Sequence, residues 1–171
     1  MTLDIKNVVV AGVSLFDHVN VRYTDCRKPN GSLGKAVIQH LQRASFNIAL
    51  LTRNVEKTNR TFPDLTATYA NYASVDELTE QLRSIGKHDA MVILINRDEI
   101  EAQINLVKAV VAAGIPHVIP SSFGLGISDP TVLALPPLHS KAKMEEFVRE
   151  KANQGSLSFT CVSGRVIEAP S

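Results

Sequence analysis

Short apolar runs alternate with amphipathic stretches along this chain. One run, Asp89–Ile95, is continuously apolar after its first residue, which is typical of a strand covered on both faces. The complete set of expected strands is Asn7–Gly12, Asn47–Thr52, Thr66–Asn71 (the weakest pattern), Asp89–Ile95, Ile115–Pro120 and Leu157–Val162.

The stretches between these runs carry apolar residues at helical spacing. Ser74 and Glu77 have the spacing of a capping box, which marks a helix start. Gly114 stands where a C-terminal glycine cap belongs. The expected helices are Ser32–Ala44 with Leu33, Val37, Leu41 and Ala44 on its inner face, a helix after Ser74, a helix from the acidic Asp98–Glu101 to Gly114, and Leu138–Asn153.

Strands and helices that alternate at this spacing form right-handed βαβ units. We therefore predict an α/β fold with a doubly wound parallel sheet of the Rossmann type.

Composition limits the classes of function. With 171 residues the chain is long enough for one domain, and 18 Lys and Arg balance 17 Asp and Glu, giving a net charge of +1. No global field therefore favours nucleic acid or an anionic membrane, and no apolar run approaches the roughly 18 residues of a membrane span. The two cysteines suggest neither a disulfide framework nor a zinc site, so we expect a cytoplasmic protein without a metal.

A glycine turn points to a nucleotide. In the predicted fold the first strand ends in a glycine-rich turn, and the following helix directs free amides at a pyrophosphate. Gly12 fits the first glycine, and Gly31, Ser32, Leu33 and Gly34 fit the second half of the motif. An ordinary turn and helix start would give the same Gly-x-x-Gly pattern.

The end of the second expected strand points to NADP(H). An acidic residue there would bind ribose hydroxyls and favour NAD, but the chain has Arg53, with Lys57 following. A guanidinium at this position can fork onto the 2′-phosphate of NADP. The alternative is a solvated surface arginine.

Five segments, taken in their order along the chain, carry a resemblance to a known family. They are GSLGKAVIQHL, LLTRN, YANYASVDELTEQL, AGIPHVIPSSFG and PPLHSKAKMEEFV. In this order the chain resembles the NmrA-like and isoflavone-reductase-like proteins, which are atypical short-chain dehydrogenase/reductase relatives. The resemblance implies NADPH at the glycine turn, with Arg53 on its 2′-phosphate. It also implies that the Pro-Ser-x-Phe-Gly segment, here with Phe123, lies near the nicotinamide; its often acidic third position is Ser122.

The resemblance also implies a catalytic lysine. The reductase branch uses a lysine in a Lys-Ala-Lys stretch as its acid/base, and Lys141 aligns with it. Lys141 precedes Met144 by three and Val148 by seven residues, so it borders the expected buried face, where its pKa would be lowered. A snorkelling surface lysine is the alternative.

Two segments depart from the family. Residues 13–30 separate the first strand from its helix, and residues 165–171 form an irregular tail after a domain spanning 1–164. A retained intron is one hypothesis for the insertion, which spliced transcripts would test. A basic lid that uses Arg22, Arg27 and Lys28, with Tyr23 stacking on a base, is the other. Family members are longer, so we expect most of the substrate region to be absent.

Three functions remain open at this stage. The first is an NADPH-dependent reductase that reduces a small organic substrate by hydride transfer. The second is a non-catalytic NADP-binding redox sensor or regulator, since several relatives bind NADP without known turnover. The third is a truncated product with little activity. The residues identify neither the substrate nor the oligomeric state.

Overall fold

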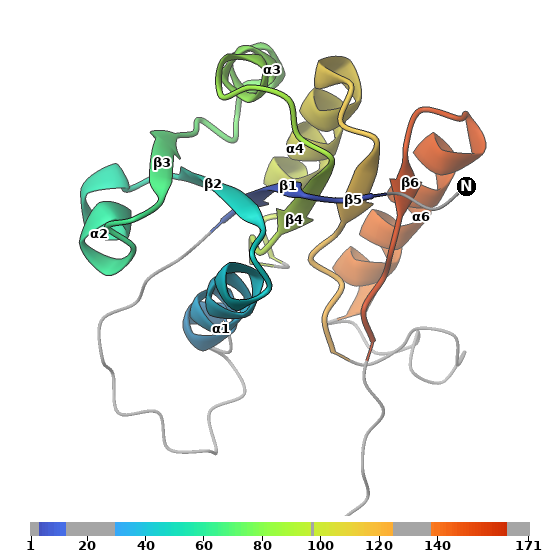
Figure 1. Ribbon diagram of the computed structural model, residues 1–171. Helices are drawn as coiled ribbons and strands as arrows, with labels where there is room; N and C mark the ends of the chain where they lie inside the picture. The colour runs from blue at the N-terminus through green and yellow to red at the C-terminus, as the bar shows by residue number, and fades with distance from the viewer. Residues whose placement is uncertain (1–3, 13–29, 97, 125–137, 164–171) are drawn as a thin grey trace, which may run out of the picture.

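The computed structural model describes residues 4–12, 30–96, 98–124 and 138–163. Within them, the strands form one parallel sheet in the order β3-β2-β1-β4-β5-β6 (Figure 1). The strands are β1 (Asn7–Ala11), β2 (Asn47–Thr52), β3 (Thr66–Tyr69), β4 (Ala90–Ile93), β5 (His117–Ile119) and β6 (Ser158–Phe159). The helices are α1 (Asn30–Arg43), α2 (Val55–Thr61), α3 (Val75–Ser84), α4 (Ile100–Ala113) and α6 (His139–Asn153). The predicted doubly wound Rossmann-type fold is confirmed.

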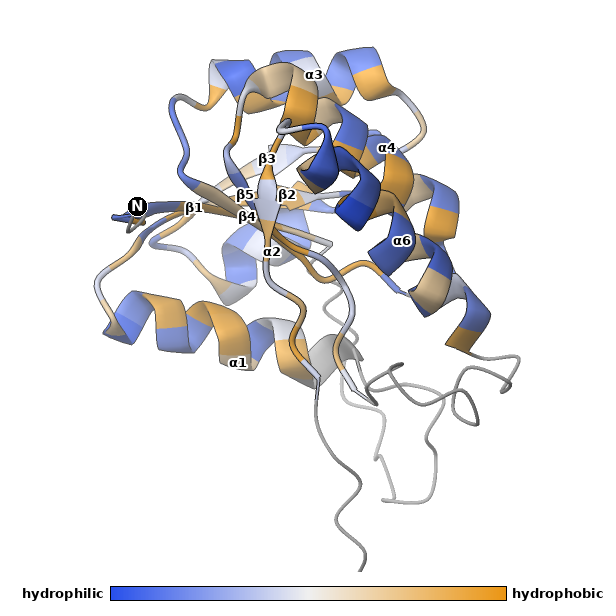
Figure 2. Cartoon of the chain, turned by 90° about the vertical axis from the view of Figure 1, so that its right-hand side faces the viewer, coloured by the Kyte–Doolittle hydropathy of each residue, from blue (hydrophilic) through white to orange (hydrophobic). Residues whose placement is uncertain are grey.

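Side chains of the central strands alternate between two hydrophobic cores. Val8 and Val10 of β1 pack with Ile38 of α1 on one face of the sheet. Val9 and Ala11 point to the other face, where α3, α4 and α6 cover the sheet (Figure 2). Since each fully buried valine or isoleucine side chain contributes about 1.5–3 kcal/mol, both faces of β1 stabilise the fold.

The two edges of the sheet differ in which helix ends they carry. The Asn47 amide, which opens β2 shortly after α1 ends, donates to the carbonyl of Lys6 just before β1. The C-terminal end of α1 therefore lies at the amino edge of the sheet. Because 14 residues of helix extend about 21 Å, the N-terminal end of α1 lies at the carboxyl edge, as Figure 2 shows.

Local details correct the sequence-based expectations. α1 begins at Asn30, two residues before the predicted start, and Ala44 is exposed while Ile38 is fully buried. The predicted strand at Thr66 exists, and Gly114 caps α4 with φ +76°. Of the two irregular segments, residues 13–29 and the tail 165–171 lie outside the described residues, so neither hypothesis for the insertion is tested.

Candidate functional site

Gly12 ends β1 at a point where no side chain fits. Its φ is +83°, and a Cβ there would lie 2.5 Å from Ile95 Cγ1 and 2.6 Å from the Ile95 amide nitrogen. Both the left-handed conformation and the close approach of Ile95, just beyond β4, therefore require glycine. β1 and β4 are the strands between which the chain reverses its strand order, so Gly12 lies at the topological switch point.

The Tyr72 hydroxyl links this turn to β2 by two hydrogen bonds. It accepts a hydrogen bond from the Gly12 amide at 3.0 Å and donates one to the Leu51 carbonyl at 2.9 Å. Burial of the ring raises the pKa of Tyr72 to about 12, so the phenol stays neutral and keeps its proton for Leu51. Sequence reasoning assigned Tyr72 no role, because a tyrosine hydroxyl gives no pattern along the chain.

The first turn of α1 contains the predicted phosphate-binding residues. Gly31, Ser32, Leu33 and Gly34 all lie in helix near its N-terminus, at the carboxyl edge of the sheet, and Gly34 is buried. The first turn contains no acidic residue, so no carboxylate of its own compensates the positive end of the helix dipole. An anion is therefore favoured there.

Arg53 follows β2 at the same edge and is paired with Glu99. Nη1 lies 2.8 Å from Oε2 and Nη2 lies 3.0 Å from Oε1 of that carboxylate. The guanidinium carbon also lies 5.8 Å from the centre of the Tyr72 ring. The sequence suggested either a phosphate ligand or a solvated arginine. The structure shows a third state, an ion pair across the ends of β2 and β4.

Lys57 and Phe123 lie on either side of this region. Lys57 is half-buried in the first turn of α2, and its amide donates to the Asn54 side chain at 2.9 Å. Phe123 is half-buried against the core on the α1 face of the sheet. Neither position tests a contact with a cofactor, so both residues stay predictions as ligands.

Lys141 belongs to a buried polar cluster near the ends of β5 and β6. Its side chain is 5% exposed, and Nζ lies 3.8 Å from Oε1 of Glu145 one turn later in α6. The Ser122 hydroxyl donates to that same oxygen. Burial lowers the pKa of Lys141, while the Glu145 and Cys161 charges oppose that shift. Thus a carboxylate still faces the third position of the Pro-Ser-x-Phe-Gly segment, although α6 supplies it.

The carboxyl edge therefore gathers most of the predicted residues. Gly12, the first turn of α1 and Arg53 surround the switch point, and Lys141 lies further along the edge. Ser121 links the two parts, since its hydroxyl donates to the Ile95 carbonyl at 2.7 Å. Sequence reasoning missed Tyr72, Glu99 and Glu145. Only Glu145 had a usable signal, its i,i+4 spacing from Lys141.

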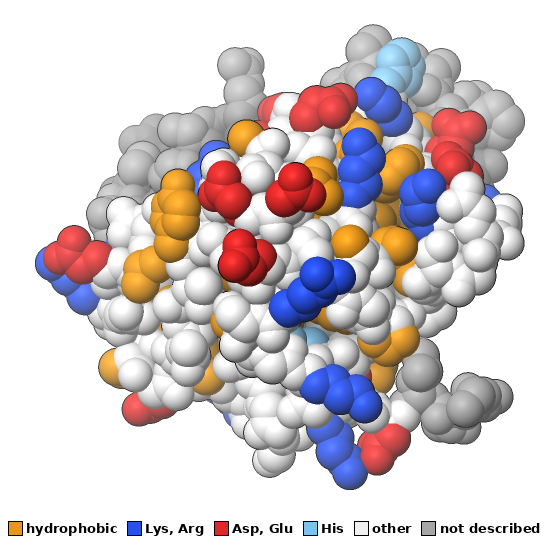
Figure 3. Space-filling view, turned by 90° about the horizontal axis from the view of Figure 1, so that it is seen from above, with side chains coloured by type: hydrophobic (Ala, Val, Ile, Leu, Met, Phe, Trp, Pro, Cys, Tyr) orange, Lys and Arg blue, Asp and Glu red, His pale blue; other side chains and the backbone are white. Residues whose placement is uncertain are grey.

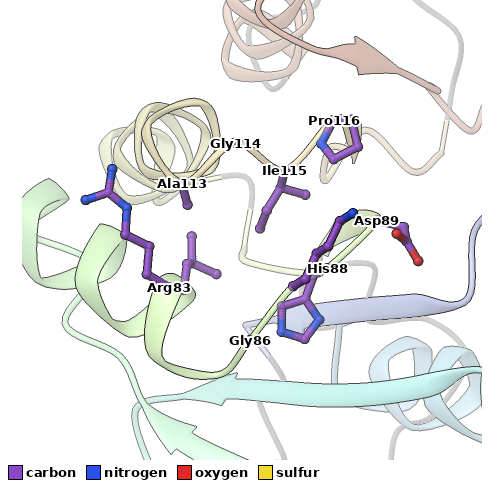
Figure 4. A pocket seen from close by; sticks show the side chains of 10 residues that line it. Arg83, Gly86, His88, Asp89, Ala113, Gly114, Ile115 and Pro116 are labelled. Atoms are coloured by element: carbon purple, nitrogen blue, oxygen red, sulfur yellow. The ribbon is translucent and has the colours of Figure 1, made fainter.

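A pocket of about 250 Å³ lies at the opposite, amino edge (Figure 4). The ends of α3 and α4 and the residues that lead into β4 and β5 line it, and the His88 ring lies near Gly86. Asp89 Oδ2 accepts hydrogen bonds from the amides of Lys6 and Asn7 at 3.0 and 2.8 Å. These bonds tie β1 to β4, so Asp89 has a structural role there.

The described part of the surface around α3 shows no single large charged or apolar patch (Figure 3). On the face that carries α3, charges of both signs are interspersed with small separate apolar areas (Figure 3). Among residues 4–12, 30–96, 98–124 and 138–163, no group of three or more His, Cys, Asp or Glu could hold a metal. The same residues contain no helix long and apolar enough to cross a membrane.

Residues 28–167 match the NmrA-like family. The chain belongs to the NmrA-like family. A curated relative, the oxidoreductase poxI of Penicillium oxalicum, is 31% identical over 99 residues, which cover 58% of this chain and 30% of that protein. This NmrA-like chain therefore matches under a third of the relative's length.

Solved structures share the fold of this NmrA-like chain. The binary complex of leucoanthocyanidin reductase with NADPH from Vitis vinifera has a TM-score of 0.66 at 21% identity, covering 92% of this chain and 47% of that one. The Citrobacter sp. triphenylmethane reductase complexed with NADP(H) has a TM-score of 0.65 at 20% identity, covering 94% and 50%. The chain thus spans about half the length of these neighbours.

Proposed function

We propose that this chain binds NADP(H) at the carboxyl edge of its sheet. The observation that carries the proposal is the arrangement at the switch point. There, Gly12, which has no room for a side chain, lies at the same edge of the sheet as the first turn of α1, which contains no acidic residue. The amides of Gly31–Gly34 would hold the pyrophosphate, and Arg53 would hold the 2′-phosphate. Lys57 and Phe123 would line the adenine and nicotinamide ends.

Two solved neighbours are complexes with NADPH and NADP(H), which supports this choice of dinucleotide. The curated relative is named an oxidoreductase. Both lines of support favour a reductase that acts on a small organic molecule. The proposal includes a cytoplasmic location and no nucleic-acid or membrane partner.

Reduction needs a proton donor beside the cofactor. When bound, a reduced nicotinamide supplies a hydride, and Lys141 would supply the proton that the reduced substrate takes up. Burial lowers the pKa of Lys141, which makes its ammonium a better acid than an exposed lysine. Glu145, at 3.8 Å, would hold the ammonium in place and is itself fixed by the Ser122 hydroxyl.

A non-catalytic NADP(H)-binding regulator is the second candidate. The observation that favours it is the 5% exposure of Lys141 together with its pairing to Glu145. A buried lysine paired with a carboxylate can have a purely structural role, because loss of either partner leaves the other charge buried and unpaired. In this reading the cofactor site is the same, but no turnover follows.

The experiment compares Lys141→Met with Lys143→Met. Lys143 is a matched control, since it lies two residues away on α6, is 60% exposed and pairs with Glu101 at 3.4 Å. NADPH affinity is measured by calorimetry, and NADPH oxidation is followed with a panel of small quinones and carbonyl compounds. We expect Lys141→Met to keep NADPH affinity within about twofold and to lose turnover by roughly 100-fold or more.

The pH dependence gives a second readout. The pKa of Lys141 is lowered from 10.5. As pH rises, kcat should therefore begin to fall at a pH below 10.5, because the ammonium loses its proton. Lys143→Met should leave both affinity and turnover unchanged. NADPH binding without turnover by the parent chain selects the regulator, and absence of NADPH binding overturns the proposed function.

A further inference from the structure

We propose that Glu99 sets the cofactor preference of this chain by competing with the 2′-phosphate of NADP(H) for Arg53. The inference rests on the proposed NADP(H) site and concerns a residue that the sequence analysis placed only in the acidic start of a helix. It predicts that the chain binds NADPH more weakly than Arg53 alone would allow.

Glu99 and a phosphate would compete because both bind the same N–H donors of Arg53. The Glu99 carboxylate takes both terminal nitrogens of Arg53, at 2.8 and 3.0 Å, in a fork-on-fork arrangement. A phosphate uses the same planar pair of N–H groups when it binds arginine bidentately. The 2′-phosphate can therefore make its strongest contact with Arg53 only after Glu99 has left at least one of these nitrogens.

The loop after β4 fixes the position of Glu99. Its amide donates to the Asn96 carbonyl at 3.0 Å, and its own carbonyl accepts from the Gln103 amide at 3.2 Å. The Gln103 side chain is buried and donates to the same Asn96 carbonyl at 2.9 Å. Glu99 is also the N-cap residue of α4, yet its side chain makes no capping hydrogen bond. The carboxylate is directed at Arg53 instead.

The pair is open enough for a ligand to reach it. The Arg53 side chain is 59% exposed and that of Glu99 is 35% exposed. Exposed ion pairs contribute little, so breaking this one weakens binding by about fivefold at most. A dianionic phosphate at Arg53 would in addition lie close to the displaced carboxylate and be repelled by it. NADH carries ribose hydroxyls at this position, so it would leave the ion pair intact.

The test compares Glu99→Gln with Glu101→Gln in the full chain. Each variant removes one negative charge at the start of α4, but the Glu101 carboxylate lies 3.4 Å from Lys143 and not on Arg53. Calorimetric titrations with NADPH and NADH are run at low salt. We expect Glu99→Gln to tighten NADPH binding by about tenfold and NADH binding by less than twofold, and Glu101→Gln to change neither appreciably.

Arg53→Ala, combined with Glu99→Gln, gives a double-mutant cycle. The cycle separates the proposed role of Glu99 from the proposed NADP(H) site itself. In the Arg53→Ala background, Glu99→Gln should favour NADPH by much less than about tenfold, because the contested donors are gone and only the repulsion between the carboxylate and the phosphate is relieved. Equal effects of Glu99→Gln and Glu101→Gln on NADPH affinity, or no effect of Glu99→Gln, overturn the role of Glu99 while leaving the NADP(H) site standing. If the parent binds neither nucleotide, the proposed site itself fails. Thermal melts of each variant verify folding.

Discussion

Gly12→Ala tests the close approach of β1 to β4 on which the candidate site depends. The new methyl group would lie 2.5 Å from Ile95 Cγ1, 2.6 Å from the Ile95 amide nitrogen and 2.9 Å from its Cα. Two of these atoms belong to the backbone, so a rotamer change cannot relieve the contact. The loop after β4 would have to move away from the end of β1.

The expected loss of stability in Gly12→Ala has two parts. Placing an L-residue at φ +83° costs about 1–2 kcal/mol, and overpacking of this kind typically costs about 1–3 kcal/mol more. We expect Gly12→Ala to lower the free energy of unfolding by roughly 2–5 kcal/mol. Gly114→Ala is the matched control, because Gly114 has φ +76° but nothing within 4 Å of its Cβ position. It should lose only about 1–2 kcal/mol.

Urea unfolding with linear extrapolation measures both losses. The difference between the two variants isolates the steric part from the conformational part. If Gly12→Ala is no less stable than Gly114→Ala, then β1 and β4 do not approach as closely as described, and the argument that this turn requires glycine is refuted.

Two further predictions concern groups around the same strands. Tyr72→Phe should lose about 1–2 kcal/mol of stability near neutral pH, since the hydroxyl serves both Gly12 and Leu51. The folded-state pKa of Tyr72, about 12 against 10.0, means that the parent should lose about 1 kcal/mol between pH 9 and 11, a loss that Tyr72→Phe should lack in urea midpoints. Backbone hydrogen bonds from Lys6 and Asn7 lower the pKa of Asp89 below 3.8. Its stabilisation is therefore present above that value and lost as pH falls through the lowered pKa. Asp89→Asn should be less stable than the parent at pH 7, and urea midpoints should converge in acid.

Elements with a hydrophobic pattern were predictable from the chain, and one without a pattern was missed. β4 was expected to be covered on both faces, and its residues do alternate between the two cores. Helix α2 was missed because only Thr58 in it is buried, so it has no apolar stripe. Its start depends on the Asn54 side chain, which accepts a hydrogen bond from the Lys57 amide.

The capping box at Ser74 shows how tertiary contacts change a local motif. The Ser74 hydroxyl accepts from the Glu77 amide at 3.3 Å, as its spacing predicts. The Glu77 carboxylate, however, accepts from the Asn71 side chain at 3.2 Å instead of returning to Ser74. Half of the motif therefore forms, and the other half is replaced by a neighbour that the spacing does not specify.

The candidate site also combines features that local spacing specifies with contacts that only the tertiary structure creates. The positions of Gly12, the first turn of α1 and Arg53 were predictable because each lies at a fixed place relative to a strand end. Their contacts with a nucleotide stay predictions. Glu99 was interpreted as part of an acidic cluster that favours a helix dipole. Its contact with Arg53 joins residues 46 positions apart, and no spacing rule connects them. Only the strand order, which brings the ends of β2 and β4 to one edge, makes that contact possible.

The central claim is that a dinucleotide binds at the carboxyl edge of the sheet, and amide NMR during an NADPH titration tests it most directly. We predict saturable shifts at Gly12, Gly34 and Arg53, with the amide of Gly86 at the opposite edge unmoved. Shifts confined to Gly86 and the other residues of the amino-edge pocket, or no shifts at all, would contradict the account.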